Sequence, residues 1–255
     1  MSLVVSDAIV LHSFDYLESS RILKIVTRDA GVRSVLARGA RRSKARFGSA
    51  LDLYAQGTAE LHVKPGRELD TLSAFEVTRS RPQLALHLAR FTGASAIAEL
   101  TLRFVRDAAD PSLFDAIAAA FDDIASSAPE RTRDVTLGGA WRVLAELGVA
   151  PTVDVCADCH SPIGPHDAVM FSHPSGGALC NRCSRLARSG RTLPPEARAA
   201  LRGWLAGGNA LLSSPQDIRA HQRLLREFLR EHLADDRPLR AFEVWERDEW
   251  TGGAA

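Results

Sequence analysis

Residues 21–37 read RILKIVTRDAGVRSVLA, and this stretch sets the fold of the first part of the chain. Two apolar runs rich in β-branched side chains, residues 21–26 and 32–36, flank the segment 27–31. That segment, Thr-Arg-Asp-Ala-Gly, has the composition of a turn and ends in glycine. The pattern predicts a β-hairpin.

Three further strands are predicted around this hairpin. An apolar run over residues 4–11 precedes it, residues 58–63 alternate between polar and apolar side chains, and residues 69–77 follow a turn at Lys64-Pro65-Gly66-Arg67. Five short strands in about 80 residues indicate a small barrel of the size of an OB-fold. Periodicity alone does not distinguish this fold from an SH3-like barrel.

Beyond Pro82 the hydrophobic period becomes helical. A stripe over residues 84–105 predicts one helix, a second opens at Asp110-Pro111-Ser112 with Ser112 as its cap, and a third ends at Gly148. Two more helices are predicted over residues 194–206 and from the cap Ser214 to about residue 234. We interpret the glycine pairs 138–139 and 207–208 as marking helix ends rather than catalytic loops.

These elements predict an α+β multidomain protein. An N-terminal five-stranded OB-fold barrel over residues 1–80 is followed by an α-helical domain over residues 81–151 and 191–255. A four-cysteine, zinc-ribbon-like module over residues 152–190 is inserted into the helical domain.

The composition is that of an average globular protein, with 255 residues, 45% hydrophobic, 25% charged, and a net charge of +1. The polar residues Ser6 and Asp7 interrupt the first apolar run, so we expect no signal-peptide core. No window holds the roughly 18 uncharged apolar residues of a membrane span. We therefore expect a cytoplasmic protein with no membrane partner. In that reducing compartment, clustered cysteines bind metal more often than they form disulfides.

The strongest chemical signal is the pair of motifs Cys156-x-x-Cys159 and Cys180-x-x-Cys183. Two-residue gaps let paired thiolates turn onto one cation, and four thiolates complete a tetrahedron. We expect one structural Zn²⁺ per chain, without an open position for hydrolysis. Unmetallated cysteines and redox pairs are the alternatives, and histidines inside the module can replace one ligand: His160, His166 and His173.

The densest cluster of positive charge lies just after the predicted hairpin, in residues 38–46, which contain five basic residues and no acidic one. A basic loop beside a small barrel favours phosphate contact and single-strand binding, whereas the alternative is a solvated loop. If side chains alternate, Lys24 and Arg33 extend the patch along one barrel face. The predicted DNA contacts are Lys24, Arg33, Arg38, Arg41, Arg42, Lys44 and Arg46. The nearby aromatic side chains are candidates for base stacking or for the core: Phe14, Tyr16, Phe47 and Tyr54.

A second basic set lies at the metal motif, spaced by three: Arg182, Arg185, Arg188 and Arg191. On a short helix this spacing places the four side chains on one face, which is either solvated or a second nucleic-acid contact. The chain has no phosphate-cradling glycine loop, nucleophile elbow or His-Glu-x-x-His motif, so we favour a binding protein over an enzyme.

An ordered set of motifs resembles the RecO family of bacterial recombination and repair mediators. The barrel part of the likeness is Asp15-Tyr16-x-Glu18, Thr27-x-x-x-Gly31 and Ala37-Arg38-Gly39-Ala40-Arg41-Arg42-x-Lys44. It continues through Leu147-Gly148 with Pro151, Cys156-x-x-Cys159, and Gly176-Gly177-x-x-Cys180-x-x-Cys183. The likeness spans most of the chain, in the family's order of barrel, helical domain and zinc module.

The resemblance implies a non-enzymatic protein that binds single- and double-stranded DNA and anneals complementary strands. It also implies work with RecR in loading RecA onto DNA coated by single-strand-binding protein, whose acidic C-terminal tail docks in the helical domain. Nucleoid-associated localisation follows from that function. Two alternatives are a zinc-ribbon transcription or translation factor that binds RNA or polymerase, and an unrecognised metal-dependent hydrolase.

Overall fold

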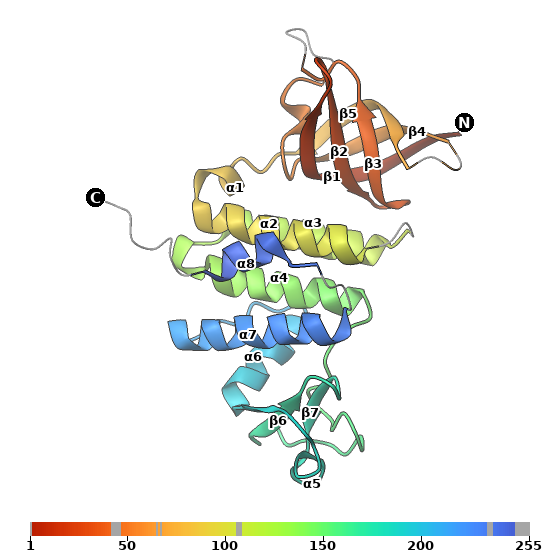
Figure 1. Cartoon of the computed structure of the whole chain (residues 1–255). Coiled ribbons are helices and arrows are strands. Elements are labelled where there is room, and N and C mark those ends of the chain that lie inside the picture. Colours follow the sequence, from red (N-terminus) through yellow and green to blue (C-terminus); the bar gives the residue numbers. More distant parts are fainter. Residues whose placement is uncertain are drawn as a thin grey trace.

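The computed structural model describes residues 2–41, 47–64, 66, 68–105, 109–233 and 237–247. Three parts follow one another along the molecule: a β-barrel, a layer of stacked helices, and a small sheet at the far end (Figure 1). The barrel and the small sheet therefore lie on opposite sides of the helical layer. None of the described helices is long and apolar enough to cross a membrane.

The barrel contains all five predicted strands. They are β1 (Ser2–Tyr16), β2 (Ser20–Thr27), β3 (Gly31–Ala37), β4 (Gln56–Val63) and β5 (Asp70–Arg79), with the short helix η1 (Gly48–Leu51) before β4. The barrel is closed in the order β1-β2-β3-β5-β4, and β3 pairs with β5 in parallel. This crossed order is OB-like rather than a simple meander, so the predicted fold class is confirmed.

Strand β1 is longer than predicted because it serves two neighbours. Residues 2–9 pair with β4 and residues 8–16 pair with β2, with a shift of the β2 register between Val10 and His12. Ala8 and Val10 point into the barrel core, whereas Ile9 and Leu11 join the core that the helices form. The shift is a β-bulge, which inserts an unpaired residue and changes the phase of the following side chains.

The helical layer begins with α1 (Gln83–Leu86), α2 (Leu88–Phe104), α3 (Pro111–Ser126), the short helix η2 (Pro129–Arg131) and α4 (Thr132–Glu146). It is completed by α6 (Pro195–Leu205), α7 (Pro215–His232) and α8 (Arg240–Glu246). Sequence patterns had not indicated α8. The cap Ser214 is confirmed, because its side chain accepts a hydrogen bond from the Asp217 amide.

Three predictions about the helices were wrong. The stripe over residues 84–105 forms two helices, since His87 adopts an extended conformation with φ of −131°. The second helix is capped by Asp110, whose carboxylate accepts from the Leu113 amide at 3.0 Å, and not by Ser112. Gly138 and Gly139 lie inside α4, where glycine gives neighbouring side chains room, whereas Gly207 does end α6, with a φ of +80°.

The barrel is fixed to the helical layer by packing and by ion pairs. Tyr54 stacks on Phe121 of α3 with ring centroids 5.0 Å apart. Arg81, buried at the junction, donates to Asp122 at 2.7 Å and to the Tyr54 carbonyl at 2.8 Å. Arg28 pairs with Asp115. The residues between the barrel and the helices therefore form one continuous core rather than a flexible linker.

The far module is a three-stranded sheet of β6 (Val169–Ser172), β7 (Gly177–Leu179) and β8 (Arg191–Leu193), with the one-turn helix α5 (Asn181–Ser184). Phe171 of β6 packs edge-on against Phe228 of α7 at 6.2 Å, which joins the module to the helical layer. The predicted helical face of four arginines was wrong, because α5 ends at Ser184 and Arg191 lies in β8.

Candidate metal centre and nucleic-acid interface

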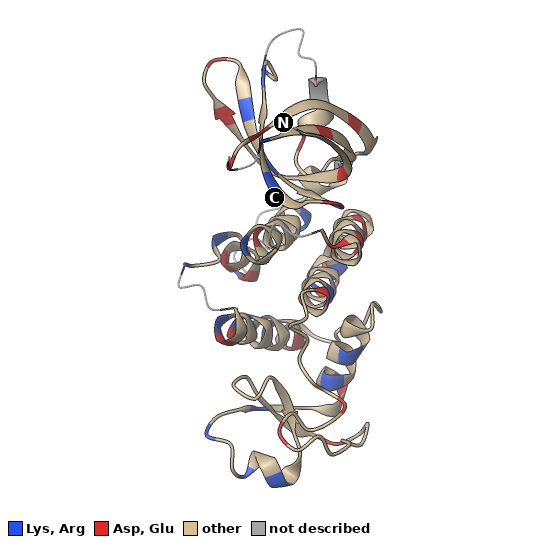
Figure 2. Cartoon of the chain, turned by 90° about the vertical axis from the view of Figure 1, so that its right-hand side faces the viewer, with Lys and Arg blue, Asp and Glu red and all other residues tan. Residues whose placement is uncertain are grey.

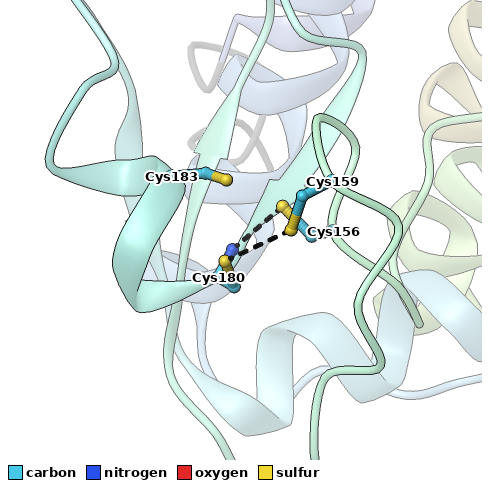
Figure 3. A group of neighbouring side chains, drawn as sticks. All are labelled: Cys156, Cys159, Cys180 and Cys183. Carbon is cyan, nitrogen blue, oxygen red and sulfur yellow. Dashed lines mark hydrogen bonds between the residues drawn. The ribbon is translucent and has the colours of Figure 1, made fainter.

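The four cysteine side chains of the module come together in one cluster (Figure 3). Cys156 and Cys159 lie in the loop before β6, Cys180 directly follows β7, and Cys183 lies in α5. Their sulfur atoms all lie within 4.8 Å of one another. The cluster therefore has the size that binding of a single metal ion requires.

Backbone hydrogen bonds shape the two turns that present the sulfurs. The His160 amide donates to the Cys156 carbonyl at 2.9 Å, and the Ser184 amide donates to the Cys180 carbonyl at 2.9 Å. His160 has a φ of +58°, which lets the first turn close after Cys159. The Cys180 amide points at the Cys156 sulfur, 3.4 Å away, so the two turns are also joined to each other.

The electrostatics of the cluster favour a bound cation. A hydrogen bond between the Cys159 sulfur and the Ser161 hydroxyl, 3.3 Å apart, lowers the pKa of Cys159 to about 6. The hydrogen bond with Cys159 and burial raise the pKa of Cys183 to about 12. Crowded thiols cannot all ionise unaided, so four thiolates require a metal ion between them. Arg182 borders the cluster, and the negative charge of Cys159 raises the pKa of its guanidinium.

No histidine joins the ligand cluster within the part of the chain that the structure describes. His160 and His166 are exposed, whereas His173 lies 3.1 Å from a carboxylate oxygen of Glu227 on α7. Burial lowers the pKa of His173. His173 therefore links the module to the helical layer and does not face the sulfurs.

The described part of the basic loop lies at the barrel end remote from the helices (Figure 1). The Arg41 amide donates to the Ser19 carbonyl at 3.0 Å, and its guanidinium lies 3.4 Å from Asp15. Arg38 is exposed beside it. Arg42, Lys44 and Arg46 lie outside the described residues.

Lys24 and Arg33 do not extend this patch along one face. Lys24 pairs with Ser34 and His12, whereas Arg33 pairs with the buried Ile25, so alternation places Lys24 and Arg33 on opposite faces. This corrects the expectation from the sequence. Both residues nevertheless line one hollow beside β3, together with Glu68 and Asp70, and the Arg33 guanidinium donates to the Ala30 carbonyl at 2.9 Å.

The structure separates the four aromatic candidates. Phe14 and Tyr16 lie on the outer face of β1 and are 41% and 40% exposed. Phe47 and Tyr54 are buried, 6% and 3% exposed. Phe14 and Tyr16 are therefore exposed enough to stack on bases. They lie opposite Ile22 and Ser20 on the neighbouring strand.

Sequence reasoning missed a cleft between α2, α7 and α8. Its lining combines four arginines and one glutamate with apolar side chains: Arg103, Arg226, Arg230, Arg237, Glu243, Phe104, Leu229, Leu233, Pro238, Leu239 and Phe242. The repeating apolar positions of α7 signal one wall, but the wall made by α8 has no distinct sequence pattern. The combination of apolar and cationic side chains suits an anionic ligand with an apolar part.

The comparisons with known proteins agree along the chain. The family model described as "Recombination protein O N terminal" matches residues 1–81, and "Recombination protein O C terminal" matches residues 86–241. Proteins named "DNA repair protein RecO" from Anaeromyxobacter sp. strain Fw109-5 and strain K are 33% and 35% identical, each alignment covering 92% of this chain and 93% of the relative.

A relative of the same name from Gloeobacter violaceus is 32% identical, over 90% of this chain and 87% of its own length. The two family models together cover the barrel and most of the helical layer with its module. The chain therefore belongs to the RecO family of DNA repair proteins.

Proposed function

We propose that this protein is a non-enzymatic mediator of recombination and repair. It binds single- and double-stranded DNA, anneals complementary strands, and works with RecR to load RecA onto DNA coated by single-strand-binding protein. The observation that carries the proposal is an open barrel face with exposed aromatic side chains beside a basic loop, in a RecO-family chain. This function places the protein in the cytoplasm, at the nucleoid.

The barrel offers both contacts that single strands use. Every base has a π-face, so stacking on Phe14 and Tyr16 is tolerant of sequence and contributes about 1–3 kcal/mol per base. The phosphates follow the neighbouring cations of the barrel end and of the hollow beside β3. The proposed DNA contacts are Lys24, Arg33, Arg38, Arg41, Arg42, Lys44 and Arg46, together with the two aromatic residues.

Zn²⁺ is the proposed occupant of the cysteine cluster. A tetrahedral ion with Zn–S bonds of about 2.3 Å separates its sulfurs by about 3.8 Å. The sulfurs of Cys159 and Cys180 lie 3.7 Å apart, which fits that edge. Four thiolates leave no position for water, so the ion stabilises the module and takes part in no hydrolysis. About one zinc per chain is the expected result of elemental analysis.

The cleft between α2, α7 and α8 is the proposed site for the acidic tail of single-strand-binding protein. Arg230, exposed at its rim, supplies charge, and the apolar floor around Phe242 accepts a hydrophobic end. Arg230→Glu reverses one charge without touching the core, and it is expected to weaken binding of a tail peptide. Unchanged peptide affinity would remove this cleft from the proposal.

A salt-titrated binding assay on a short single strand tests the DNA interface. Phe14→Ala/Tyr16→Ala should lose about 1–3 kcal/mol per stacked base, and Arg41→Ala/Arg42→Ala should also lower the salt slope. Arg223→Ala, exposed on α7 away from the barrel, is the control. Equal affinity and slope in the parent and both barrel variants would contradict the proposed function.

A further inference from the structure

The tip of the metal module presents an exposed basic surface. The segment 180–191 contains four arginines and no acidic residue. Arg182, Arg185 and Arg188 are exposed, and Leu186 between them is 83% exposed, the highest value among the large hydrophobic side chains described. We call the surface formed by these four residues the module tip.

The cations of the module tip are not neutralised by carboxylates. Neither Arg185 nor Arg188 forms an ion pair with any residue that the structure describes. By contrast, Arg191 donates to Glu227 at 2.7 Å, and Arg202 of α6 pairs with Asp154. The arginines nearest the helical layer are therefore used in joining it to the module, whereas Arg185 and Arg188 remain open to an external anion.

The metal cluster holds the tip in shape. Arg185 and Leu186 lie two and three residues after Cys183, and the Leu186 amide donates to the Cys183 carbonyl at 3.0 Å. The Ser184 amide is likewise bonded to the Cys180 carbonyl. A rigid backbone lowers the entropy lost when side chains bind a ligand. The tip is therefore a preorganised surface and not a free loop.

The chemistry of the tip fits a nucleic acid. About half to two-thirds of the hydrogen bonds in protein–DNA interfaces go to phosphate and sugar, and arginine is among their donors. An exposed leucine flanked by arginines also has the composition of side chains that enter between base steps. The tip lies at the opposite end of the molecule from the barrel, with the helical layer between them (Figures 1 and 2).

We infer that the module tip is a second nucleic-acid contact, which binds the phosphate backbone of a strand through Arg182, Arg185 and Arg188. The inference rests on the proposed function, because the barrel binds the first strand. Two phosphate-binding surfaces at opposite ends let one chain hold two strands at once. Annealing needs such a joint complex, so the module contributes to annealing although its metal site has no catalytic part.

The test uses the full-length, zinc-loaded chain and Arg185→Gln/Arg188→Gln, which leaves Arg182 beside the sulfurs. Zinc content and melting temperature should equal those of the parent. On a long single strand, the loss of two phosphate contacts should reduce the steepness of the salt dependence by about 1.4. The drop in affinity between 50 and 200 mM salt should therefore be about sevenfold smaller than in the parent. A short oligonucleotide that fills only the barrel should bind as it does to the parent.

Energy transfer between two labelled, non-complementary oligonucleotides reports joint binding, and this signal should fall in the double variant. The single variants Arg185→Gln and Arg188→Gln are compared with Arg223→Gln, an exposed arginine on α7, which should leave the signal unchanged. Parent-like slope, transfer and annealing in the double variant would overturn the inference.

Two further outcomes separate this inference from the proposed function. A parent that binds no DNA would overturn both. If Phe14→Ala/Tyr16→Ala weakens DNA binding while the tip variant changes only the capture of an acidic protein, the proposed function stands and the tip is a protein-binding surface, which overturns the inference.

Discussion

Asp15 provides a gain-of-affinity test of the barrel interface. Its carboxylate lies 3.5 Å from the Arg21 guanidinium and 3.4 Å from that of Arg41, at the barrel end that carries the basic loop. The carboxylate partly neutralises both cations and repels an incoming phosphate. Asp15→Asn keeps the shape of the side chain and removes that charge, so it should strengthen DNA binding.

The size of the effect follows from the geometry. A phosphate in contact with Arg41 lies about 7 Å from the Asp15 carboxylate, which corresponds to a repulsion of about 0.6 kcal/mol in water and about 2.4 kcal/mol at an effective dielectric constant of 20. Screening over a Debye length of about 8 Å reduces these values to about 0.2–1 kcal/mol. Asp15→Asn should therefore raise single-strand affinity by a factor of about 1.5 to 5 at physiological salt.

Fluorescence anisotropy with a labelled single strand, measured across a salt series, provides the assay. The gain should shrink as salt increases, because it is electrostatic. Asp123→Asn is the matched control, since Asp123 forms a similar pair with Arg142 within the helical layer, 3.4 Å away. If Asp15→Asn binds no more tightly than the control variant at low salt, Arg41 does not contact DNA.

Three other predictions concern stability. Chelation of the metal should release about one zinc per chain and lower the melting temperature, whereas a metal-free protein with an unchanged melting curve would contradict a structural zinc. Phe47→Ala should cost about 3–5 kcal/mol in chemical denaturation because this ring lies in the barrel core. Burial lowers the pKa of His221 to about 4 from 6.5, so the unfolded chain takes up this proton first as the pH falls. The contribution of neutral His221 to the free energy of unfolding is complete above pH 6.5 and is lost as the pH falls towards 4, by about 3 kcal/mol at most. His221→Gln should therefore flatten this part of the plot of stability against pH.

Local signals in the sequence predicted much of the architecture. Strand periodicity identified the five strands, and the cap Ser214 with Pro215 identified the start of α7. The cysteine spacing identified the ligand cluster, because two-residue gaps constrain the backbone directly. In each case, residues close in sequence contain the physical cause, so no knowledge of distant neighbours is needed.

Features created by distant neighbours could not be predicted in this way. A Cβ atom on Gly138 would lie 2.8 Å from the Trp204 ring, and one on Gly139 would lie 2.9 Å from Ala120. These glycines therefore permit helix packing, although in sequence they look like a helix end. The cleft between α2, α7 and α8 is similar, since it exists only where α8 packs on α2.

The outer face of β1 shows most clearly why the proposed DNA interface could not be located from the sequence alone. Strict alternation from the inward-facing Ala8 and Val10 would place Phe14 and Tyr16 inside the barrel. The bulge between Val10 and His12 inserts one residue and reverses that phase, so both rings point outward.

The same face of β1 therefore has two uses. Before the bulge it packs Ile9 against the helical layer, and beyond the bulge it leaves Phe14 and Tyr16 exposed. Because of a single inserted residue, one strand can hold the barrel against the helices and also expose two aromatic rings for stacking. The proposed DNA-binding face depends on this register more than on composition, which is why counting aromatic residues in the sequence could not locate it.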